Sequence, residues 1–493
     1  MTHTKSSIWW SLAIFGVTFA VLLMTVAPTI YTLVDSSEYA IGAYTLGIVH
    51  APGYPLYLLL ARLFTELPIG TIAYRVNLLS AVSLALAGVF LFNFLAELTG
   101  KRWLALVGTL LTLWSYNIWV VGVAAEVYAP ELAALGAFAW TLARCRRLKS
   151  ERLAVLAGAL YGLAVALNPT AIFLVLGVLV AFLILSLRWR IRLLGGALAV
   201  VIFILPLIYF PIRYQTSPAF NAAGIYGADG AFAPINLTTL DGIWWLLSGK
   251  MFTRLFFAEG IIPTLPQIMD TLNLFWGNFL IFGSLFGLLG LGVMFRQQRR
   301  LFIVWISFFV PYVYFYTTYG AVDRDTMFGP ALLAWAVPFV FGVGWLAREF
   351  SPRWRTVLVA ALVIAPLLIN FPLVNASRDT NNYQHGEEMS QRLPANAVVM
   401  GNWLDIITLQ YLQLVEGQRP DVTLYNTFYF PTMPFEQFIR QTIHDGQRPV
   451  VLLNLELDDS AKIEPLLNEY QARPELNNGA VLFYRLVEKA PAH

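Results

Sequence analysis

The sequence predicts an all-α polytopic membrane protein that ends in a small α/β domain. Of its 493 residues, 58% are hydrophobic and only 12% are charged, whereas soluble proteins carry roughly 25% charged residues. Its long apolar stretches reach the roughly 20 residues that a helix needs to cross a bilayer. From about residue 376 the composition is that of an ordinary soluble protein. We therefore expect a transmembrane domain over residues 1–375 and an α/β domain over residues 376–493.

About eleven apolar stretches are candidate transmembrane helices. They cover roughly residues 9–31, 78–96, 103–121, 129–143, 153–167, 170–187, 193–211, 273–295, 301–319, 328–347 and 356–373. The first stretch is longer than the core of a signal peptide and has no clear cleavage site with small residues. It is therefore interpreted as a retained signal anchor.

Basic residues gather in alternate loops between these stretches. They are Lys101 and Arg102; Arg144, Arg146, Arg147, Lys149 and Arg152; Arg188, Arg190 and Arg192; Arg296, Arg299 and Arg300; and Arg348, Arg353 and Arg355. Loops rich in Lys and Arg stay in the cytoplasm, so the N-terminus is predicted to be cytoplasmic in a multi-pass protein of the plasma membrane. The outer face then carries Asp35, Glu38, Glu126, Asn168, residues 212–272, Asp323, Asp325 and the extracytoplasmic C-terminal domain.

The polar tail alternates short apolar runs with helical patterns. Residues 397–402, 421–426, 449–456 and 479–486 are predicted strands, and residues 404–416 and 433–444 are predicted helices. Two outer segments of the membrane part are also unusual. Residues 35–76 are predicted to form two short interfacial helices, broken at Ala-Pro-Gly-Tyr-Pro (51–55). Residues 212–272 are long for a structureless connection, which favours a functional segment.

Two acids follow the first apolar stretch. Asp35 and Glu38 have the spacing of a capping box that opens a helix. Carboxylates at a membrane edge are also expensive and are often functional, and this spacing places both on one side of a helix. We expect both roles to coexist.

The other polar candidates each have a plain alternative. Glu126 fits a solvated turn, and the Asp323-Arg324-Asp325 cluster fits a self-paired turn. His50 fits a buried, hydrogen-bonded residue, and as a lone histidine it indicates no metal site. The arginines at the outer ends of apolar stretches fit snorkelling cations; they are Arg62, Arg75 and Arg213.

The placement of charge separates the function classes. The predicted spans hold almost no ionisable residues, whereas coupled transporters place charges near the middle of the membrane. Acids and arginines collected on one face instead favour a reaction at the boundary between lipid and water, with Arg binding a phosphate and a carboxylate activating a nucleophile. The net charge of +3 indicates no nucleic-acid partner. The single cysteine, Cys145, permits no intramolecular disulfide and indicates no metal cluster.

Three consecutive motifs carry a resemblance to a known family. DSSEY (35–39), HAPGYPLY (50–57) and RVNLLS (75–80) resemble the signature of the DUF2723 family, which comprises membrane glycosyltransferases similar to protein O-mannosyltransferases and has the GT-C fold. Three further segments agree: AEVYA (125–129), PIR (211–213) and YLQLVEGQRPDVTLYN (411–426). The sequence departs from the family pattern at Ala51, at Asn168-Pro169 and at GNWLD (401–405).

The resemblance implies transfer of a sugar, such as mannose, from a polyprenyl-phosphate donor to an external acceptor hydroxyl such as a protein Ser or Thr or a glycan. It implies Asp35 as the general base with Glu38 beside it, and displacement with inversion. Residues expected at the donor phosphate or substrate are His50, Tyr54, Arg62, Arg75, Asn77, Glu126, Tyr128, Arg213, Lys250 and Arg254, with Arg75 and Arg213 preferred. No motif requires a cofactor, and a divalent metal ion is permitted but not indicated. The alternatives are a flippase or transporter of lipid-linked saccharides and a non-catalytic assembly factor.

Overall fold

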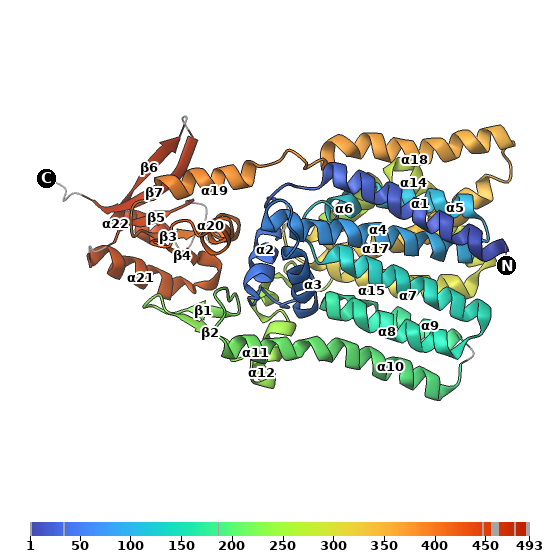
Figure 1. The fold of residues 1–493 in the computed structure, drawn as a ribbon, viewed down its shortest axis with the longest axis horizontal. Coiled ribbons are helices and arrows are strands. Elements are labelled where there is room, and N and C mark those ends of the chain that lie inside the picture. Colours follow the sequence, from blue (N-terminus) through green and yellow to red (C-terminus); the bar gives the residue numbers. More distant parts are fainter. Residues whose placement is uncertain are drawn as a thin grey trace.

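The computed structural model of the protein describes residues 2–32, 35–185, 187–445, 448–454, 463–477 and 480–489. A bundle of long helices lies beside a smaller α/β region at one end of the bundle (Figure 1). The helices of the bundle are α1 (Thr2–Thr25), α4 (Ile72–Thr99), α5 (Arg102–Leu113), α6 (Tyr116–Val120), α7 (Tyr128–Leu148), α8 (Glu151–Leu167), η1 (Pro169–Leu174), α9 (Val175–Ile184), α10 (Trp189–Ile204), α14 (Leu280–Gln297), α15 (Arg299–Thr318), α17 (Gly329–Leu346) and α18 (Pro352–Val374).

Each predicted span overlaps helix in the structure, although α1 ends at Thr25, before the end of the predicted span 9–31. Among the described residues, seven helical segments are long and apolar enough to cross a membrane, and shorter apolar helices accompany them. The chain is thus a multi-pass membrane protein, and the number eleven stays a prediction. The predicted span 273–295 is divided at Phe279, where α13 (Leu265–Asn278) ends and α14 begins.

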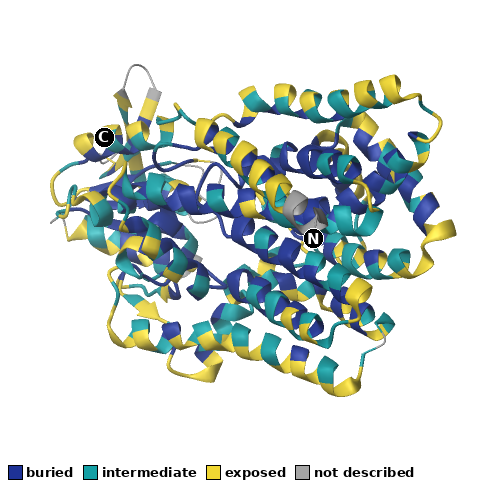
Figure 2. Ribbon diagram, turned by 45° about the vertical axis from the view of Figure 1, so that its right-hand side comes forward, coloured by how far each residue is buried: buried dark blue, intermediate teal, exposed yellow. Residues whose placement is uncertain are grey.

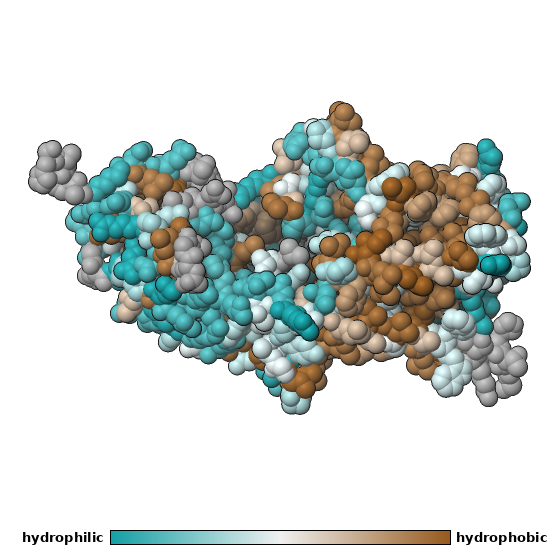
Figure 3. Space-filling view, turned by 90° about the horizontal axis from the view of Figure 1, so that it is seen from above, coloured by the Kyte–Doolittle hydropathy of each residue, from teal (hydrophilic) through white to brown (hydrophobic). Residues whose placement is uncertain are grey.

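The surface of the bundle is apolar where lipid would contact it. On the face drawn in Figure 3, hydrophobic side chains cover the middle of the bundle and hydrophilic ones cover the α/β region. Helices α4 and α17 are central, with 72% and 78% of their apolar windows buried, whereas the windows that contain α10 and α18 are only 17% and 22% buried. The latter two lie at the periphery with exposed side chains (Figure 2). Apolar residues at such positions are stable in a lipid solvent.

Small residues bring α8 and α10 together. A Cβ atom on Gly158 would lie 2.4 Å from the carbonyl oxygen of Gly195, and one on Gly162 would lie 2.4 Å from that of Ala199. Glycine at a spacing of four residues lets two membrane helices approach backbone to backbone. This contact forms one wall of the cavity described below.

The region between α1 and α4 contains two short helices, as predicted. They are α2 (Ser36–Thr45) and α3 (Pro55–Thr65), and they lie across the end of the bundle next to the α/β region (Figure 1). The break between them includes Gly53, whose φ is +87°. A Cβ atom there would lie within 3 Å of the Phe210 ring and of Leu246, so both the backbone conformation and the space require glycine.

Residues 212–272 contain secondary structure that the sequence did not predict. Its elements, with those that flank it, are η2 (Leu205–Ile208), α11 (Tyr209–Gln215), β1 (Gly224–Tyr226), β2 (Phe232–Pro234), α12 (Leu240–Leu247), η3 (Lys250–Leu255) and α13. The antiparallel hairpin β1–β2 reaches the α/β region, where Tyr226 stacks on Phe430 with ring centroids 4.5 Å apart. The segment therefore joins the bundle to the α/β region.

The C-terminal α/β region begins after α18. It contains α19 (Asn381–Arg392), β3 (Val398–Gly401), α20 (Trp403–Glu416), β4 (Thr423–Asn426), η4 (Thr427–Tyr429), α21 (Thr432–His444), β5 (Val450–Leu452), α22 (Glu464–Glu469), β6 (Tyr470–Asn477) and β7 (Ala480–Glu488). The strand order is β4-β3-β5-β7-β6, parallel across the first three strands and antiparallel across the rest. The predicted helices and strands are found, although residues 455, 456 and 479 lie outside the described part. Helix α19 and strand β6 were not predicted.

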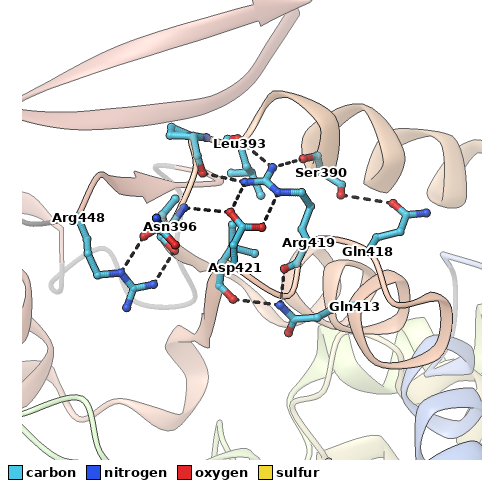
Figure 4. A network of polar contacts seen from close by, with 11 residues as sticks. Ser390, Leu393, Asn396, Gln413, Gln418, Arg419, Asp421 and Arg448 are labelled. Atoms are coloured by element: carbon cyan, nitrogen blue, oxygen red, sulfur yellow. Dashed lines mark hydrogen bonds and ion pairs between the residues drawn. The ribbon is translucent and has the colours of Figure 1, made fainter.

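A polar network fixes the approach to β3. Arg419 donates two hydrogen bonds to the carboxylate of Asp421, at 2.8 and 2.9 Å, and two more to the carbonyl oxygens of Leu393 and Pro394 (Figure 4). Asp421 also accepts a hydrogen bond from the main-chain N–H of Asn396 at 3.0 Å. Bidentate Arg–carboxylate pairs restrict geometry strongly, so the turns before β3 and β4 are held together.

Candidate active site

A cavity of about 1450 Å³ runs along the bundle and ends beneath the α/β region. Its long part is apolar and is lined by α8, α9, α10 and α15, including Gly196, Val200 and Phe203. Arg192 lies at the α10 end of the lining, near the N-terminus of that helix. The other end is polar and aromatic, and its lining includes Asp35, His50, Tyr54, Tyr128, Arg254, Asp323 and Trp403. The cavity thus joins an apolar groove to a cluster of ionisable groups.

His50 and Glu38 form a buried pair at the polar end. His50 Nδ1 lies 2.5 Å from Glu38 Oε2, and the main-chain N–H of His50 donates to Glu38 Oε1 at 2.7 Å. The Glu38 side chain is fully buried, whereas His50 lines the cavity. Both oxygens of Glu38 are therefore used to hold His50.

Asp35 lies on the other side of the imidazole. Its Oδ2 atom is 3.6 Å from His50 Nε2. A quarter of the Asp35 side chain is exposed, and this residue lines the cavity. Asp35 is accessible to a bound substrate, and Glu38 is not.

The capping-box prediction is wrong in its hydrogen bonds. Asp35 stands at the N-cap of α2, but its side chain makes no cap hydrogen bond, and Glu38 turns to His50 instead. The prediction that both acids lie on one side of the helix is confirmed, because Asp35, Glu38 and His50 offer oxygen and nitrogen atoms within 4.8 Å of one another.

The electrostatics of the cluster follow from its burial. Burial raises the pKa of Asp35 to about 7, against the opposing effect of His50. Burial alone would lower the pKa of His50, but the carboxylates of Glu38 and Asp35 raise it to about 9. The imidazole is therefore a cation between two carboxyl groups at neutral pH.

Glu126 is buried, which contradicts its interpretation as a solvated turn residue. Its Oε1 atom accepts a hydrogen bond from the main-chain N–H of Asp35 at 3.3 Å. Burial and the nearby Asp35 carboxylate raise its pKa well above the ordinary range. Next to it, Asn77 donates to the carbonyl oxygens of Ala27 and Thr29 and accepts from Ala125 N. Glu126 and Asn77 therefore hold the backbone around Asp35, and neither is on the cavity lining.

The two tyrosines named from the sequence do lie at the site. Tyr54 and Tyr128 line the cavity, and the Tyr54 ring meets the His50 ring edge-on at 5.7 Å. Both are mostly buried, so each presents a small part of its side chain to a substrate.

Three of the predicted phosphate-binding arginines are engaged elsewhere. Arg75 donates to the carbonyl oxygens of Thr65, Ile69 and Gly70. Arg213 donates to those of Leu46 and Thr45, and Arg62 donates to that of Tyr44 and pairs with Glu66. None of the three lines the cavity within the described part of the chain. The structure does not support the preference for Arg75 and Arg213, because main-chain carbonyls occupy their N–H groups.

Arg254 is the predicted cation that does line the cavity. Its guanidinium lies over the ring of Phe428, 5.0 Å from the centroid. Over the ranges that the structure describes, no ion pair of Arg254 with a carboxylate is found. Lys250, at the start of η3, is exposed and outside the lining. An arginine without a carboxylate partner at a cavity wall is suited to an anionic ligand.

Asp323, which the sequence favoured as part of a self-paired turn, lies at the site with Trp403 and Phe428, which the sequence did not predict there. Asp323 lies on the exposed rim of the cavity, and its charge acts on Asp35. Its neighbour Arg324 pairs with Asp270 at 3.5 Å, so the expected self-paired turn is only partly formed. Trp403 and Phe428 reach the cavity from the C-terminal region. The departure of GNWLD from the family pattern was the one signal that could have pointed to Trp403.

The sequence suggested that His50 is a lone histidine, but in the structure it lies beside two carboxylates. Together with Asp35 and Glu38 it forms a group whose donor atoms suit a divalent cation. The Glu38 carboxylate and His50 Nδ1 are already bonded to each other, so Asp35 and His50 Nε2 are the atoms of this group that face the cavity. Binding of a cation there would require His50 to lose the proton on Nε2 and with it its positive charge.

Comparisons with known proteins relate part of the chain to protein O-mannosyl-transferases. Residues 35–192, which include Asp35, Glu38, His50 and Glu126, match the model of the protein O-mannosyl-transferase TMEM260 N-terminal domain. The chain is 38% identical over 120 residues to protein O-mannosyl-transferase TMEM260 of Mus musculus and 26% identical over 98 residues to its counterpart in Dictyostelium discoideum. These alignments cover 24% and 19% of this chain and only 17% and 12% of the two relatives.

The fold resembles that of solved membrane glycosyltransferases. ArnT from Cupriavidus metallidurans bound to undecaprenyl phosphate aligns with a TM-score of 0.56 at 12% identity, over 98% of both chains. The archaeal oligosaccharyltransferase AglB from Archaeoglobus fulgidus, solved with an inhibitory peptide and a dolichol-phosphate, also aligns with a TM-score of 0.56, at 11% identity, over 98% of this chain and 74% of that one. The expected GT-C fold is thus confirmed. The match of the chain to the O-mannosyl-transferase family model covers the segment that carries the acid cluster.

Proposed function

We propose that this protein is a membrane glycosyltransferase that moves a sugar from a polyprenyl-phosphate donor to an external acceptor hydroxyl. The observation that carries the proposal is the continuous cavity, which is apolar along the bundle and ends at Asp35 and His50. A substrate with a long hydrocarbon chain and a reactive polar head fits these two halves. The names of the relatives favour mannose as the sugar and a protein hydroxyl as the acceptor.

The donor side rests on the groove and on Arg254. A polyprenyl chain would bury apolar surface against α8, α9 and α10, and its phosphate would lie near the cationic end at Arg254. As the sugar leaves, negative charge returns to the phosphate, and a cation aimed at that charge lowers the barrier. This assignment replaces Arg75 and Arg213 as the preferred phosphate ligands.

The acceptor side rests on Asp35. An alcohol is a weak nucleophile at neutral pH, so a carboxylate accepts its proton as the oxygen attacks. The new bond joins the acceptor oxygen to the anomeric carbon, the bond between that carbon and the phosphate oxygen breaks, and the electron pair leaves with the polyprenyl phosphate. The proton goes to Asp35, and a single displacement of this kind inverts the anomeric carbon.

Glu38 has a different role from the one that the sequence suggested. It does not line the cavity and holds His50 through two contacts. We assign it as a positioning residue that keeps the imidazole protonated beside Asp35. His50 then offsets the negative charge of Asp35, which keeps this acid in its ionised, proton-accepting form.

The orientation follows from the basic loops. The end of the bundle that carries the acid cluster lies outside the cytoplasm, in the plasma membrane, and the C-terminal region is extracytoplasmic. Cysteine labelling in intact cells tests this orientation. In a Cys145→Ser background, Gln215→Cys is expected to react with an impermeant maleimide and Lys149→Cys is expected to be protected. The reverse pattern would contradict the orientation.

Transfer itself is tested with purified protein. Wild type and Asp35→Asn would be incubated with labelled polyprenyl-phosphate sugars and acceptor peptides or glycans, with Asp241→Asn as the control. Asp241 is an exposed acid in the first turn of α12, away from the cavity lining. We expect wild type and the control to consume the donor and Asp35→Asn to fail. Movement of an intact lipid-linked saccharide between leaflets, without cleavage, would instead support the flippase.

A further inference from the structure

A second cavity lies between α7 and α15, and we call it the α7–α15 pocket. Its volume is about 160 Å³, and α4, α9 and α17 complete its lining. Two arginines belong to that lining, Arg146 in the last turn of α7 and Arg300 in the first turn of α15. The opposite ends of these two helices carry Tyr128 and Tyr316, which line the cavity at the acid cluster. Both arginines therefore lie at the end of the bundle away from the acid cluster.

The rest of the α7–α15 pocket is apolar and about as deep as one leaflet of a bilayer. Apart from the two arginines, every residue of the lining is apolar. On α7 the lining extends from Leu135 to Arg146, about 16 Å along the helix at roughly 1.5 Å per residue. This length is about half of the roughly 30 Å hydrocarbon core of a bilayer. The buried side chains of Phe138 and Trp305 belong to the lining, so the pocket penetrates the bundle.

The two arginines of the pocket differ from their neighbours in the sequence. Arg147 pairs with Glu97, and Arg299 lies over the ring of Phe295. Within the residues that the structure describes, no hydrogen bond, ion pair or ring contact is found for either arginine of the pocket. The arginine on α15 also stands in the first turn of its helix, where the helix dipole disfavours a cation. An anion bound beside the two guanidinium groups would offset both charges.

An arginine at the end of an apolar helix can also extend to the membrane surface without a specific ligand. Arg353 fits this description, because it is exposed in the first turn of α18 and does not line the pocket. The arginines of the pocket instead come from two helices that are distant in the sequence, and they border the same apolar space. A ligand with an anionic head and a hydrocarbon chain matches both parts. A neutral lipid would fill the apolar part and leave both charges without a partner.

We propose that the α7–α15 pocket binds an anionic phospholipid, with the phosphate at Arg146 and Arg300 and an acyl chain in the apolar part. Guanidinium groups bind phosphate through paired, charge-assisted hydrogen bonds. In the orientation proposed above, this end of the bundle faces the cytoplasmic leaflet, whose surface carries anionic lipids. The site takes no part in the proposed transfer reaction, so the two can be tested separately.

The test uses the purified full-length protein in detergent micelles, titrated with phosphatidylglycerol that carries a label and a photoactivatable acyl chain. Bound label gives the dissociation constant, and mass spectrometry locates the crosslinked peptides. The variant Arg146→Gln/Arg300→Gln removes both charges, and Ala143→Leu narrows the apolar part of the pocket. The matched control is Arg353→Gln, which removes an exposed arginine from the first turn of another helix.

We expect wild type to bind phosphatidylglycerol saturably, with crosslinks on α7 and α15. The double variant should raise the dissociation constant about 30-fold, since each arginine near an anionic lipid contributes about fivefold. Ala143→Leu should also weaken binding, whereas Arg353→Gln should stay within about twofold of wild type. Phosphatidylglycerol should raise the melting temperature of wild type and not that of the double variant, because a ligand that binds only the folded state stabilises it.

Three results would overturn the proposal. Equal binding of phosphatidylcholine with the same label, with crosslinks spread over the peripheral helices α10 and α18, would indicate ordinary surface lipid. Displacement by an equimolar polyprenyl phosphate would assign the pocket to the lipid of the donor. If the double variant does not fold, the crosslinks of wild type decide: label on α7 and α15 supports the site, and label elsewhere contradicts it. A protein that binds the phospholipid here and transfers no sugar would contradict the proposed function alone.

Discussion

One carboxylate, that of Glu38, holds His50 at two points. It lies 2.7 Å from the main-chain nitrogen of His50 and 2.5 Å from Nδ1 of its ring. This pair divides the two acids of the DSSEY motif into different roles. Glu38 is fully buried and faces His50, whereas Asp35 is partly exposed and lines the cavity. Two acids that look equivalent in the sequence therefore differ in their contacts: Glu38 contacts His50, and Asp35 faces the cavity.

Replacing Asp35 by Asn is expected to lower kcat by about 10²- to 10⁴-fold, the usual contribution of general base catalysis. Asn keeps the shape of the side chain, but it cannot take a proton. Donor affinity, measured by binding of a labelled polyprenyl phosphate, should change little. A kcat within a few-fold of wild type would contradict the role of Asp35.

Replacing Glu38 by Gln is expected to act on stability and on His50. Removing one partner of a buried ion pair costs about 3–5 kcal/mol, and loss of the carboxylate lowers the pKa of His50. Thermal unfolding in detergent would measure the loss. The double variant Glu38→Gln/His50→Gln should be less destabilised than the sum of the single variants, because the two residues act as a pair. Strict additivity would show that they do not interact.

Activity is expected to follow a bell-shaped dependence on pH. Asp35 must be ionised, so the rate should rise as the pH passes about 7. His50 must be protonated to offset that charge, so the rate should fall as the pH passes about 9. Initial rates of transfer from pH 5 to 10 would test both limbs. A rate that stays constant from pH 5 to 7 would exclude Asp35 as a base with a raised pKa.

The stability of the fold should depend on pH through the protonation of His50. The pKa of His50 is raised above its ordinary value of 6.5, so its stabilising contribution is fully present below pH 6.5 and is lost as the pH rises through about 9. Melting temperatures between pH 6 and 10 should therefore fall, and they should fall less in His50→Gln. An equal fall in both proteins would assign it to other groups.

Arg254 and Arg213 should respond differently to replacement by Ala. Loss of Arg254 is expected to raise the KM for the donor and to lower kcat, because it removes the cation at the cavity wall. Loss of Arg213 is expected to lower the free energy of unfolding by about 1–3 kcal/mol, because the carbonyls of Leu46 and Thr45 lose their hydrogen-bond donors. If Arg213→Ala alone impaired donor binding, the phosphate would lie nearer the position preferred from the sequence.

Two glycines on the cavity wall allow the effects of helix packing and of groove width to be tested separately. A Cβ atom on Gly196 meets nothing within 4 Å, whereas one on Gly158 collides with the backbone of Gly195. Gly196→Leu should therefore fold and raise the KM for long-chain donors more than for short-chain ones, as it narrows the groove. Gly158→Leu should lower the melting temperature by forcing α8 and α10 apart. Equal effects of Gly196→Leu on both donors would place the chain elsewhere.

The sequence alone determined the class of the protein and the place of its acid cluster. The lengths of the apolar stretches predicted the helices of the bundle, because a bilayer imposes both length and composition on each span. Local turn chemistry predicted the break between α2 and α3, and periodicity predicted most of the α/β region. The DSSEY and HAPGYPLY motifs correctly brought Asp35, Glu38 and His50 into one segment.

The tertiary structure alone decided which charges meet. Main-chain carbonyls accept hydrogen bonds from Arg75 and Arg213, whereas Arg254 faces the cavity. The Trp403 ring contacts the His50 ring, although the two residues are 353 positions apart in the sequence. Such pairings depend on the three-dimensional path of the chain and not on local periodicity. A hydrogen bond is made over about 3 Å, and no sequence spacing specifies a distance of that size between separate elements.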